Sequence, residues 1–102
     1  MTDHWIVVGA GAAGCVAAAR LSETGDRRVT LLEDGPDLVA GQGPPSIDGP
    51  TFLDAHAEPG RTHDHLVAAR PADTDATQYL RGRGVGGSTA VNAMIALRGD
   101  PQ

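Results

Sequence analysis

Two glycine-rich loops in this 102-residue chain have the residue types and the spacing to bind a phosphorylated ligand. In the first, residues 8–14, Gly9 permits a tight turn, Gly11 permits close approach of a pyrophosphate, and Gly14 permits a helix to pack closely on a strand. The second loop, residues 81–92, has the sequence RGRGVGGSTAVN. Glycines let consecutive backbone N–H groups face an anion, so the two loops predict one large nucleotide cofactor held at two places.

A pair of carboxylates stands where the ribose of such a cofactor would lie. Glu33 follows Gly14 by 19 residues and is itself followed by Asp34. In dinucleotide-binding domains, an acidic residue about 20 residues past the glycines accepts hydrogen bonds from the adenosine ribose. Two carboxylates would repel a 2′-phosphate, and no arginine stands at this strand end. We therefore expect FAD or NAD, which carry a free 2′-hydroxyl, and we disfavour NADP.

A strand, a helix and a second strand are needed to position these residues. The apolar run 5–8 precedes the first loop, and the small-residue run 15–19 follows it. The helix is expected to end before Gly25, because glycine suits the left-handed position after a helix terminus. Residues 28–32 are typical of a buried parallel strand. The sequence therefore predicts an α/β fold with a parallel βαβ unit over residues 4–34.

A long connection follows the predicted βαβ unit. Prolines and glycines interrupt every candidate helix between residues 35 and about 60. The irregular connection is expected to extend to about residue 77. Residues 66–70 and 78–81 are candidates for short strands.

The last segment, residues 78–99, combines the second loop with a predicted helix. Residues 88–97 are small or apolar on all sides, which indicates a helix buried against other surfaces. Ser88 or Thr89 is expected to cap its first turn with a hydroxyl group.

The two loops also carry a family resemblance. Residues 82–92, followed by Ala96 and Gly99, resemble the first signature of the glucose-methanol-choline (GMC) oxidoreductases, and residues 9–33 resemble their amino-terminal FAD fingerprint. The resemblance covers essentially all of this chain but only the opening part of a typical member. It implies a partial Rossmann-like FAD-binding domain over residues 1–102, without the substrate domain, and it implies oxidation of an alcohol with hydride transfer to the flavin.

Two features of the chain qualify what the resemblance implies. In some family members a histidine just before the asparagine bonds covalently to the flavin; here that position is Val91, which implies non-covalent FAD. The family's catalytic histidine lies near the far end of a much longer chain, beyond Gln102. We therefore expect no catalytic residue and no turnover from these residues alone. Asp64 and His65 stand where many members have Asp-Trp.

The expected site consists of cofactor contacts, with no catalytic and no metal-binding residue among them. Arg83 would add a cation to the phosphate site. The resemblance implies that Val85 and residues 92–95 lie beside the flavin. The expected contacts are Gly9, Gly11, Ala12, Ala13, Gly14, Glu33, Asp34, Arg83, Val85, Gly86, Gly87, Ser88, Asn92, Ala93, Met94 and Ile95.

Four other functions are compatible with parts of the sequence. The first loop alone would suit an NAD-dependent dehydrogenase, although the second loop argues against one. Gly82 and Gly87 have the spacing of a P-loop, but Ser88 stands where that motif requires lysine. A single Arg-Gly-Arg-Gly without neighbouring aromatic residues gives little support to an RNA-binding segment. The fourth alternative is a non-catalytic nucleotide-binding module, or a module completed by another chain.

Composition disfavours several classes of partner. A net charge of −5 argues against nucleic acid and anionic membranes. No apolar stretch approaches bilayer length, residues 1–4 lack the basic start of a signal peptide, and Cys15 is the single cysteine. Residues 63–65, His-Asp-His, offer too few donors for a metal site. We expect a cytoplasmic protein without an intrachain disulfide, whose complete form acts on a small-molecule alcohol.

Overall fold

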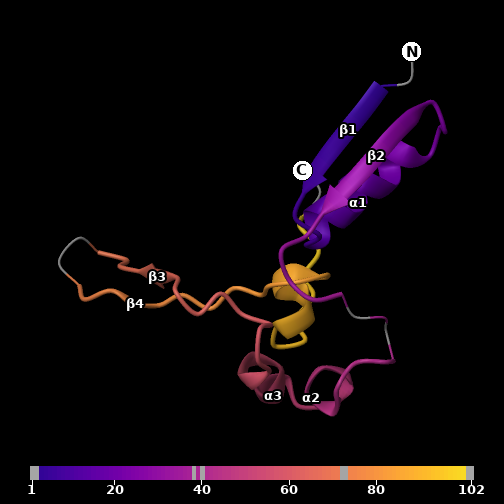
Figure 1. The fold of residues 1–102 in the computed structure, drawn as a ribbon. Coiled ribbons are helices and arrows are strands. Elements are labelled where there is room, and N and C mark those ends of the chain that lie inside the picture. Colours follow the sequence, from indigo (N-terminus) through magenta and orange to yellow (C-terminus); the bar gives the residue numbers. More distant parts are fainter. Residues whose placement is uncertain (1–2, 38, 40, 72–73, 101–102) are drawn as a thin grey trace.

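The first part of the chain forms a parallel βαβ unit (Figure 1). The computed structural model describes residues 3–37, 39, 41–71 and 74–100, so both ends of the expected domain, residues 1–2 and 101–102, lie outside the described residues. Strand β1 covers Asp3–Val8, helix α1 covers Ala12–Ser22 and strand β2 covers Arg27–Leu32. The two strands pair in parallel, with Trp5 opposite Val29. The predicted α/β fold with a βαβ unit is confirmed.

Two glycines of the first loop make close contact between α1 and β1 possible. Gly9 has a φ of +94°, a left-handed conformation that other residues rarely adopt, and its N–H donates to the Leu32 carbonyl over 2.7 Å. A Cβ atom on Gly14 would lie 1.8 Å from the Gly9 carbonyl oxygen. The tight turn and the close packing of helix on strand that the sequence predicts are therefore both present.

Gly14→Ala is expected to lower the free energy of unfolding by about 1–3 kcal/mol, the usual cost of overpacking. The added methyl group would overlap the backbone of Gly9, which cannot move away without opening the turn. Gly99→Ala is the matched control, because no atom lies within 4 Å of its Cβ position. Urea denaturation followed by circular dichroism gives both midpoints. Equal midpoints for the two variants would contradict this account of the helix–strand contact.

Two short helices lie in the connection that the sequence predicts to be irregular. Helix α2 covers Pro45–Asp48 and helix α3 covers Phe52–Ala57, so this part of the prediction is wrong. Pro45 occupies the first turn of α2, where a backbone N–H would have no partner within the helix. Pro59 lies just beyond the end of α3. These prolines lie at the ends of the two helices and do not interrupt them. The irregular segment was predicted because every proline was counted as an interruption.

A two-stranded arm leads from this connection to the second loop. Strand β3 (Val67–Ala68) and strand β4 (Thr77–Gln78) pair antiparallel, so the two candidate strand segments do pair, although β4 begins one residue early. The pairing continues toward the loop through an isolated bridge between Thr62 and Gly82. In Figure 1 the arm projects away from the βαβ unit. After the arm, the chain returns to the end of β2, and the arm does not cover the sheet (Figure 1).

The helix predicted over residues 88–97 is much shorter in the structure. A 3-10 helix, η1, covers Gly87–Val91, and Asn92 already has an extended conformation. The apolar side chains within residues 94–97 are exposed. Because helices in proteins gain most of their stability from packing an apolar face, this segment has no reason to stay helical.

Neither predicted hydroxyl caps this short helix. Ser88 Oγ accepts a hydrogen bond from the Gly82 N–H at 3.0 Å, and Thr89 Oγ1 donates to the Gly86 carbonyl at 2.5 Å. Gly86 holds the N-cap position with a left-handed φ of +92°. Both hydroxyl groups therefore hold the second loop in shape instead of capping the helix that follows it.

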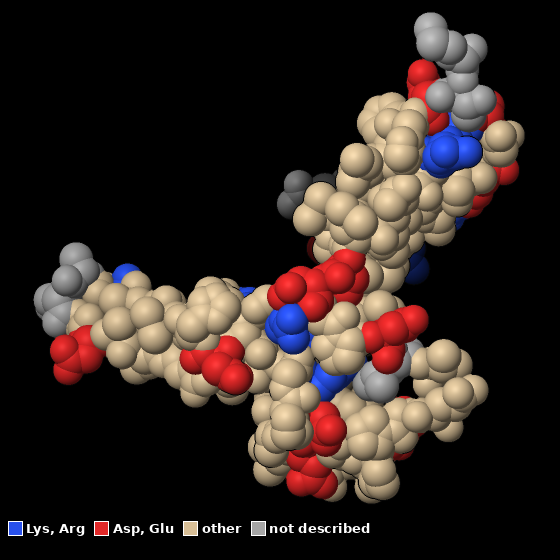
Figure 2. Space-filling view, viewed as in Figure 1, with Lys and Arg blue, Asp and Glu red and all other residues tan. Residues whose placement is uncertain are grey.

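Among the described residues, few apolar side chains are buried, and α1 contributes none of them. They are Ala10 of the first loop, Ala55 of α3 and Val91 at the end of η1. In contrast, Trp5 is 46% exposed and Val8 is 82% exposed. Figure 2 shows an extended area of uncharged side chains over β1 and β2. Within the part of the chain that the structure describes, no helix has the length and hydropathy to cross a membrane.

Candidate functional site

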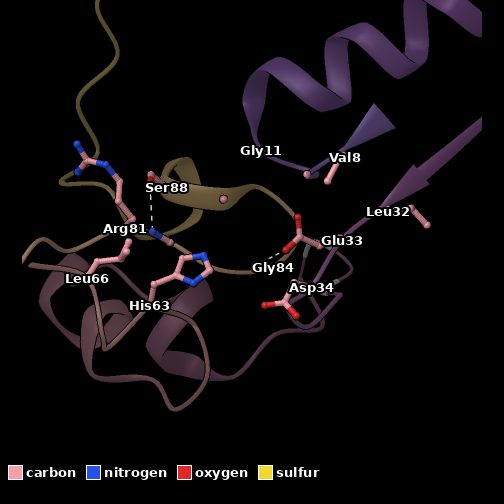
Figure 3. Close-up of a pocket in the computed structure, with 13 residues that line it drawn as sticks. Val8, Gly11, Leu32, Glu33, Asp34, His63, Leu66, Arg81, Gly84 and Ser88 are labelled. Carbon is pink, nitrogen blue, oxygen red and sulfur yellow. Dashed lines mark hydrogen bonds between the residues drawn. The ribbon is translucent and has the colours of Figure 1, made fainter. Parts of the chain in front are cut away.

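A cavity of about 680 Å³ opens between the two glycine-rich loops (Figure 3). Its volume lies in the range of small-molecule and cofactor sites. The carboxyl ends of β1 and β2 reach it, which is where parallel sheets bind ligands. Six of the expected contacts line it: Gly9, Gly11, Glu33, Asp34, Gly87 and Ser88.

Seven further residues line the cavity, and only the glycines among them carried a signal in the sequence. These are Val8, Leu32, His63, Leu66, Arg81, Gly82 and Gly84. Two of them, Gly82 and Gly84, belong to the second glycine motif, so their residue type gave a signal. No pattern pointed to His63. His63 reaches the cavity because the two segments of the arm pair with each other, and its N–H donates to the Arg81 carbonyl over 3.0 Å.

The two glycine-rich loops touch each other directly. The Gly86 N–H donates to the Ala10 carbonyl over 2.8 Å, and Gly11 and Gly86 form a parallel bridge. A Cβ atom on Gly87 would lie 3.0 Å from the Gly11 Cα atom. The lack of a side chain at Gly11 and Gly87 thus lets the two backbones line one cavity from both sides.

Glu33 joins three backbone segments at the edge of this cavity. Its Oε2 atom accepts the Ala10 N–H at 2.6 Å, and its Oε1 atom accepts the N–H groups of Gly35 and Gly84, each at 2.9 Å. The hydrogen bonds from Ala10 and Gly35 hold the pKa of this half-buried carboxyl below its ordinary value. Glu33 is therefore an ionised acceptor at neutral pH.

Arg83 pairs with the other carboxylate of the site. Its Nε atom lies 2.7 Å from Asp34 Oδ2, and its Nη2 atom donates to the Asp34 carbonyl at 2.6 Å. The hydrogen bond from Arg83 lowers the pKa of Asp34, and the same contact raises the pKa of Arg83. The expected phosphate cation thus faces an acid at the end of β2, and it does not line the cavity between the loops.

Arg61 supports the second loop from a buried position that the sequence did not indicate. It is 3% exposed, and its Nη1 atom donates to the Pro36 carbonyl at 3.1 Å. The same carbonyl accepts the Val85 N–H, and the Arg61 carbonyl accepts the Arg83 N–H. An arginine in a segment rich in glycine and proline is typical of a surface, so no signal in the sequence marked it as buried.

The remaining expected contacts lie outside the cavity lining. Residues 12–14 form the first turn of α1 directly after Gly11, and their N–H groups have no acceptor within the helix. Residues 92–95 follow η1 and are exposed, and Val85 is bonded through its backbone to the turn after β2. The structure therefore brings together the two loops and Glu33, but it leaves residues 92–95, which were expected beside a flavin, on the surface.

The histidine cluster on the arm does not gather further metal donors. The rings of His63 and His65 meet edge to face with centroids 5.9 Å apart. Among the described residues there is no group of three or more His, Cys, Asp or Glu side chains that could hold a metal ion.

Comparison with known proteins adds a family and several relatives. The family model described as an NAD(P)-binding Rossmann-like domain matches residues 7–79. Mitochondrial choline dehydrogenase from Homo sapiens is 43% identical over 100 residues, which cover 93% of this chain and 17% of that protein. The 5-(hydroxymethyl)furfural oxidase from Methylovorus sp. (strain MP688) is 38% identical over 113 residues, which cover 100% of this chain and 21% of that protein.

A further relative is named for alcohols in general. The alcohol dehydrogenase (acceptor) of Pseudomonas putida is 35% identical over 97 residues, covering 93% of this chain and 17% of that protein. The chain thus spans only about a fifth of the length of these relatives. Their names agree with the alcohol-oxidising family that the two glycine loops resemble.

Proposed function

Because this chain belongs to the NAD(P)-binding Rossmann-like domains and, with its relatives, to the GMC oxidoreductases, we propose that it is the FAD-binding portion of an enzyme that oxidises a small-molecule alcohol. The observation that carries the proposal is the meeting of Gly11, Gly87 and Glu33 at one cavity. When bound, FAD supplies the ring that accepts hydride from the alcohol carbon.

The residues at the cavity fit the dinucleotide part of FAD. Gly11 and Gly87 present backbone without side chains, so a diphosphate can approach the chain closely at both. The expected row of free N–H groups is not present in the second loop, because Gly84, Gly86 and Gly87 already donate to Glu33, Ala10 and Gly84. Three of the roughly four lone-pair positions on the Glu33 carboxylate accept backbone N–H groups, and the fourth is available to a ribose hydroxyl. Val8 and Leu32 line the same cavity and would offer a bound adenine an apolar wall.

The position of Arg83 bears on the choice between FAD and NADP. No arginine stands at the end of β2 in the sequence, yet the second loop brings Arg83 to Asp34. An arginine at this place accommodates the 2′-phosphate of NADP in related folds. Here the guanidinium is already matched by the Asp34 carboxylate, and Glu33 adds a second negative charge at the cavity. FAD, with a free 2′-hydroxyl, therefore stays the preferred ligand.

FAD should bind the purified 102-residue chain only weakly, but with a lower Kd than NAD or NADP, and ADP should displace it. Flavin fluorescence gives the FAD titration and the ADP competition, and calorimetry gives the values for NAD and NADP. After acid precipitation the flavin should appear in the supernatant, because Val91 cannot form the histidyl bond that some family members use. NAD binding without FAD binding would favour the NAD-dependent dehydrogenase instead, and flavin that remains with the precipitate would refute the non-covalent attachment.

We also propose that these residues supply cofactor contacts and no catalytic base. Of the 4 histidines, His63 is the one that lines the cavity. The FAD-loaded chain should therefore show no turnover with primary, secondary or aromatic alcohols and a dye acceptor. Turnover that disappears in His63→Ala would show that a base is present after all.

A further inference from the structure

Glu33 makes contacts that recognition of a ribose does not require. Its carboxylate bonds the first loop at Ala10, the turn after β2 at Gly35 and the second loop at Gly84. Within the described residues, it is the one side chain hydrogen-bonded to both glycine-rich loops. The direct backbone bond between the loops, from Gly86 to Ala10, lies beside this junction.

We propose that Glu33 is a positioning residue that fixes the spacing of the two glycine-rich loops across the cavity, whether or not a ligand is bound. The consequence, a preformed gap for a dinucleotide, rests on the proposed function. It concerns the protein's own backbone and not the ribose, so the two can be tested separately.

The burial of the donors explains why a side chain is needed at this point. Ala10 is 1% exposed and Gly84 is also buried, and the Glu33 carboxylate is the acceptor that the structure gives for each of their N–H groups. Buried backbone N–H groups are almost always paired, because an unpaired one loses its bonds to water without replacement. Glu33 therefore supplies the loops with acceptors that neither loop provides for itself.

The chemistry of the carboxylate distinguishes it from its closest replacement. Both oxygens of Glu33 accept N–H groups, one from Ala10 and the other from Gly35 and Gly84. Glutamine has the same length and one acceptor oxygen, so its NH₂ group would face an N–H donor at one of the two positions. A glutamine could still bond a ribose hydroxyl through either end of its amide. Glu33→Gln thus removes the junction while retaining the capacity for ribose contact.

Amide NMR of the 102-residue chain tests the junction directly. Between pH 7 and pH 3, the amide signals of Ala10, Gly35 and Gly84 should shift together with one midpoint, and that midpoint should lie below the ordinary glutamate value of about 4.3. The shared transition should disappear in Glu33→Gln. The charged and titratable groups around this carboxylate are Asp34 and Arg83, which are paired with each other, and His63, which lines the same cavity.

Asp34→Asn is the matched control, because it removes the neighbouring carboxylate without touching the three donors. In this variant the three amides should keep one common midpoint. Separate midpoints for Ala10 and Gly84 in the wild-type chain, a shared transition that persists in Glu33→Gln, or the absence of any common transition in the wild type would each overturn the proposal.

The same samples separate this proposal from the proposed function. If the three amides titrate together and the chain binds no FAD, the junction stands and the cofactor assignment fails. If FAD binds while the amides titrate independently, the cofactor assignment stands and Glu33 acts only at the ribose.

Discussion

Gly87→Val should weaken FAD binding by about 30-fold or more. At residue 87 the backbone has a φ of +52°, which costs a side-chain-bearing residue about 1–3 kcal/mol, and the new Cβ atom would lie 3.0 Å from the Gly11 Cα atom. The strain acts on the free and the bound protein alike, but about 2 kcal/mol needed to bring the overpacked loops together around a ligand corresponds to roughly a 30-fold change in Kd. The loss arises because the loops must separate, which widens the gap in which the diphosphate is expected to bind.

Gly41→Val separates backbone strain from loop contact. Gly41 also has a positive φ, +75°, but nothing lies within 4 Å of its Cβ position. Both variants should be destabilised in urea, and only Gly87→Val should lose FAD affinity beyond what the unfolded fraction explains. If the two variants bind FAD equally well, the second loop is not a cofactor contact.

The first loop could be predicted from the sequence because its physics is local. Gly9 and Gly14 lie between a strand and the first turn of a helix, and each meets a local constraint: a left-handed φ at Gly9 and contact with the Gly9 carbonyl at Gly14. The position of Glu33 was predictable for the same reason, since a βαβ unit fixes the distance from the glycines to the end of the next strand.

The contacts between distant segments were not predictable in this way. Glu33 bonds Gly84, 51 residues further along the chain, through a backbone N–H that carries no mark in the sequence. Arg83 was expected to face a phosphate, yet its guanidinium pairs with Asp34, which lies 49 residues earlier in the chain. Residue type therefore indicated which chemistry the loops carry, and only the fold revealed which partners that chemistry meets.

Two predictions about helices failed because composition does not show what a segment packs against. Residues 88–97 have the composition of a buried helix, but η1 ends at Val91, the last residue of the segment that is buried. Residues 52–57 lie between Pro50 and Pro59, yet they form α3 and bury Ala55. In both cases packing, which a single sequence does not display, decided the outcome.

Glu33→Ala should lower the free energy of unfolding by about 2 kcal/mol or more at pH 7, in addition to removing a ribose acceptor. The buried N–H groups of Ala10 and Gly84 would each lose their acceptor, and an unsatisfied buried donor costs about 1–3 kcal/mol. The sequence alone predicted only the loss of the ribose hydrogen bond, which is about 1.5–3 kcal/mol of binding free energy. Urea denaturation without ligand measures the first effect, and FAD titration measures the two together.

The pH dependence of this loss identifies its cause. Hydrogen bonds from Ala10 and Gly35 hold the pKa of folded Glu33 below its unfolded value of about 4.3. The stability that Glu33 contributes is therefore fully present above that unfolded value and is lost as the pH falls through the folded pKa. The difference between wild type and Glu33→Ala should be constant near neutral pH and should shrink in acid.

Glu23→Ala is the control for loss of an acidic side chain. Glu23, the residue after α1, pairs with Arg20 in the last turn of that helix, and such exposed pairs contribute about 0–1 kcal/mol. Its small effect should not depend on the junction between the loops. If Glu33→Ala costs no more than Glu23→Ala, or costs as much in acid as at pH 7, then the carboxylate does not hold the loops together. The two glycine-rich loops would in that case be joined by their backbone contact alone, through Gly86 and Ala10.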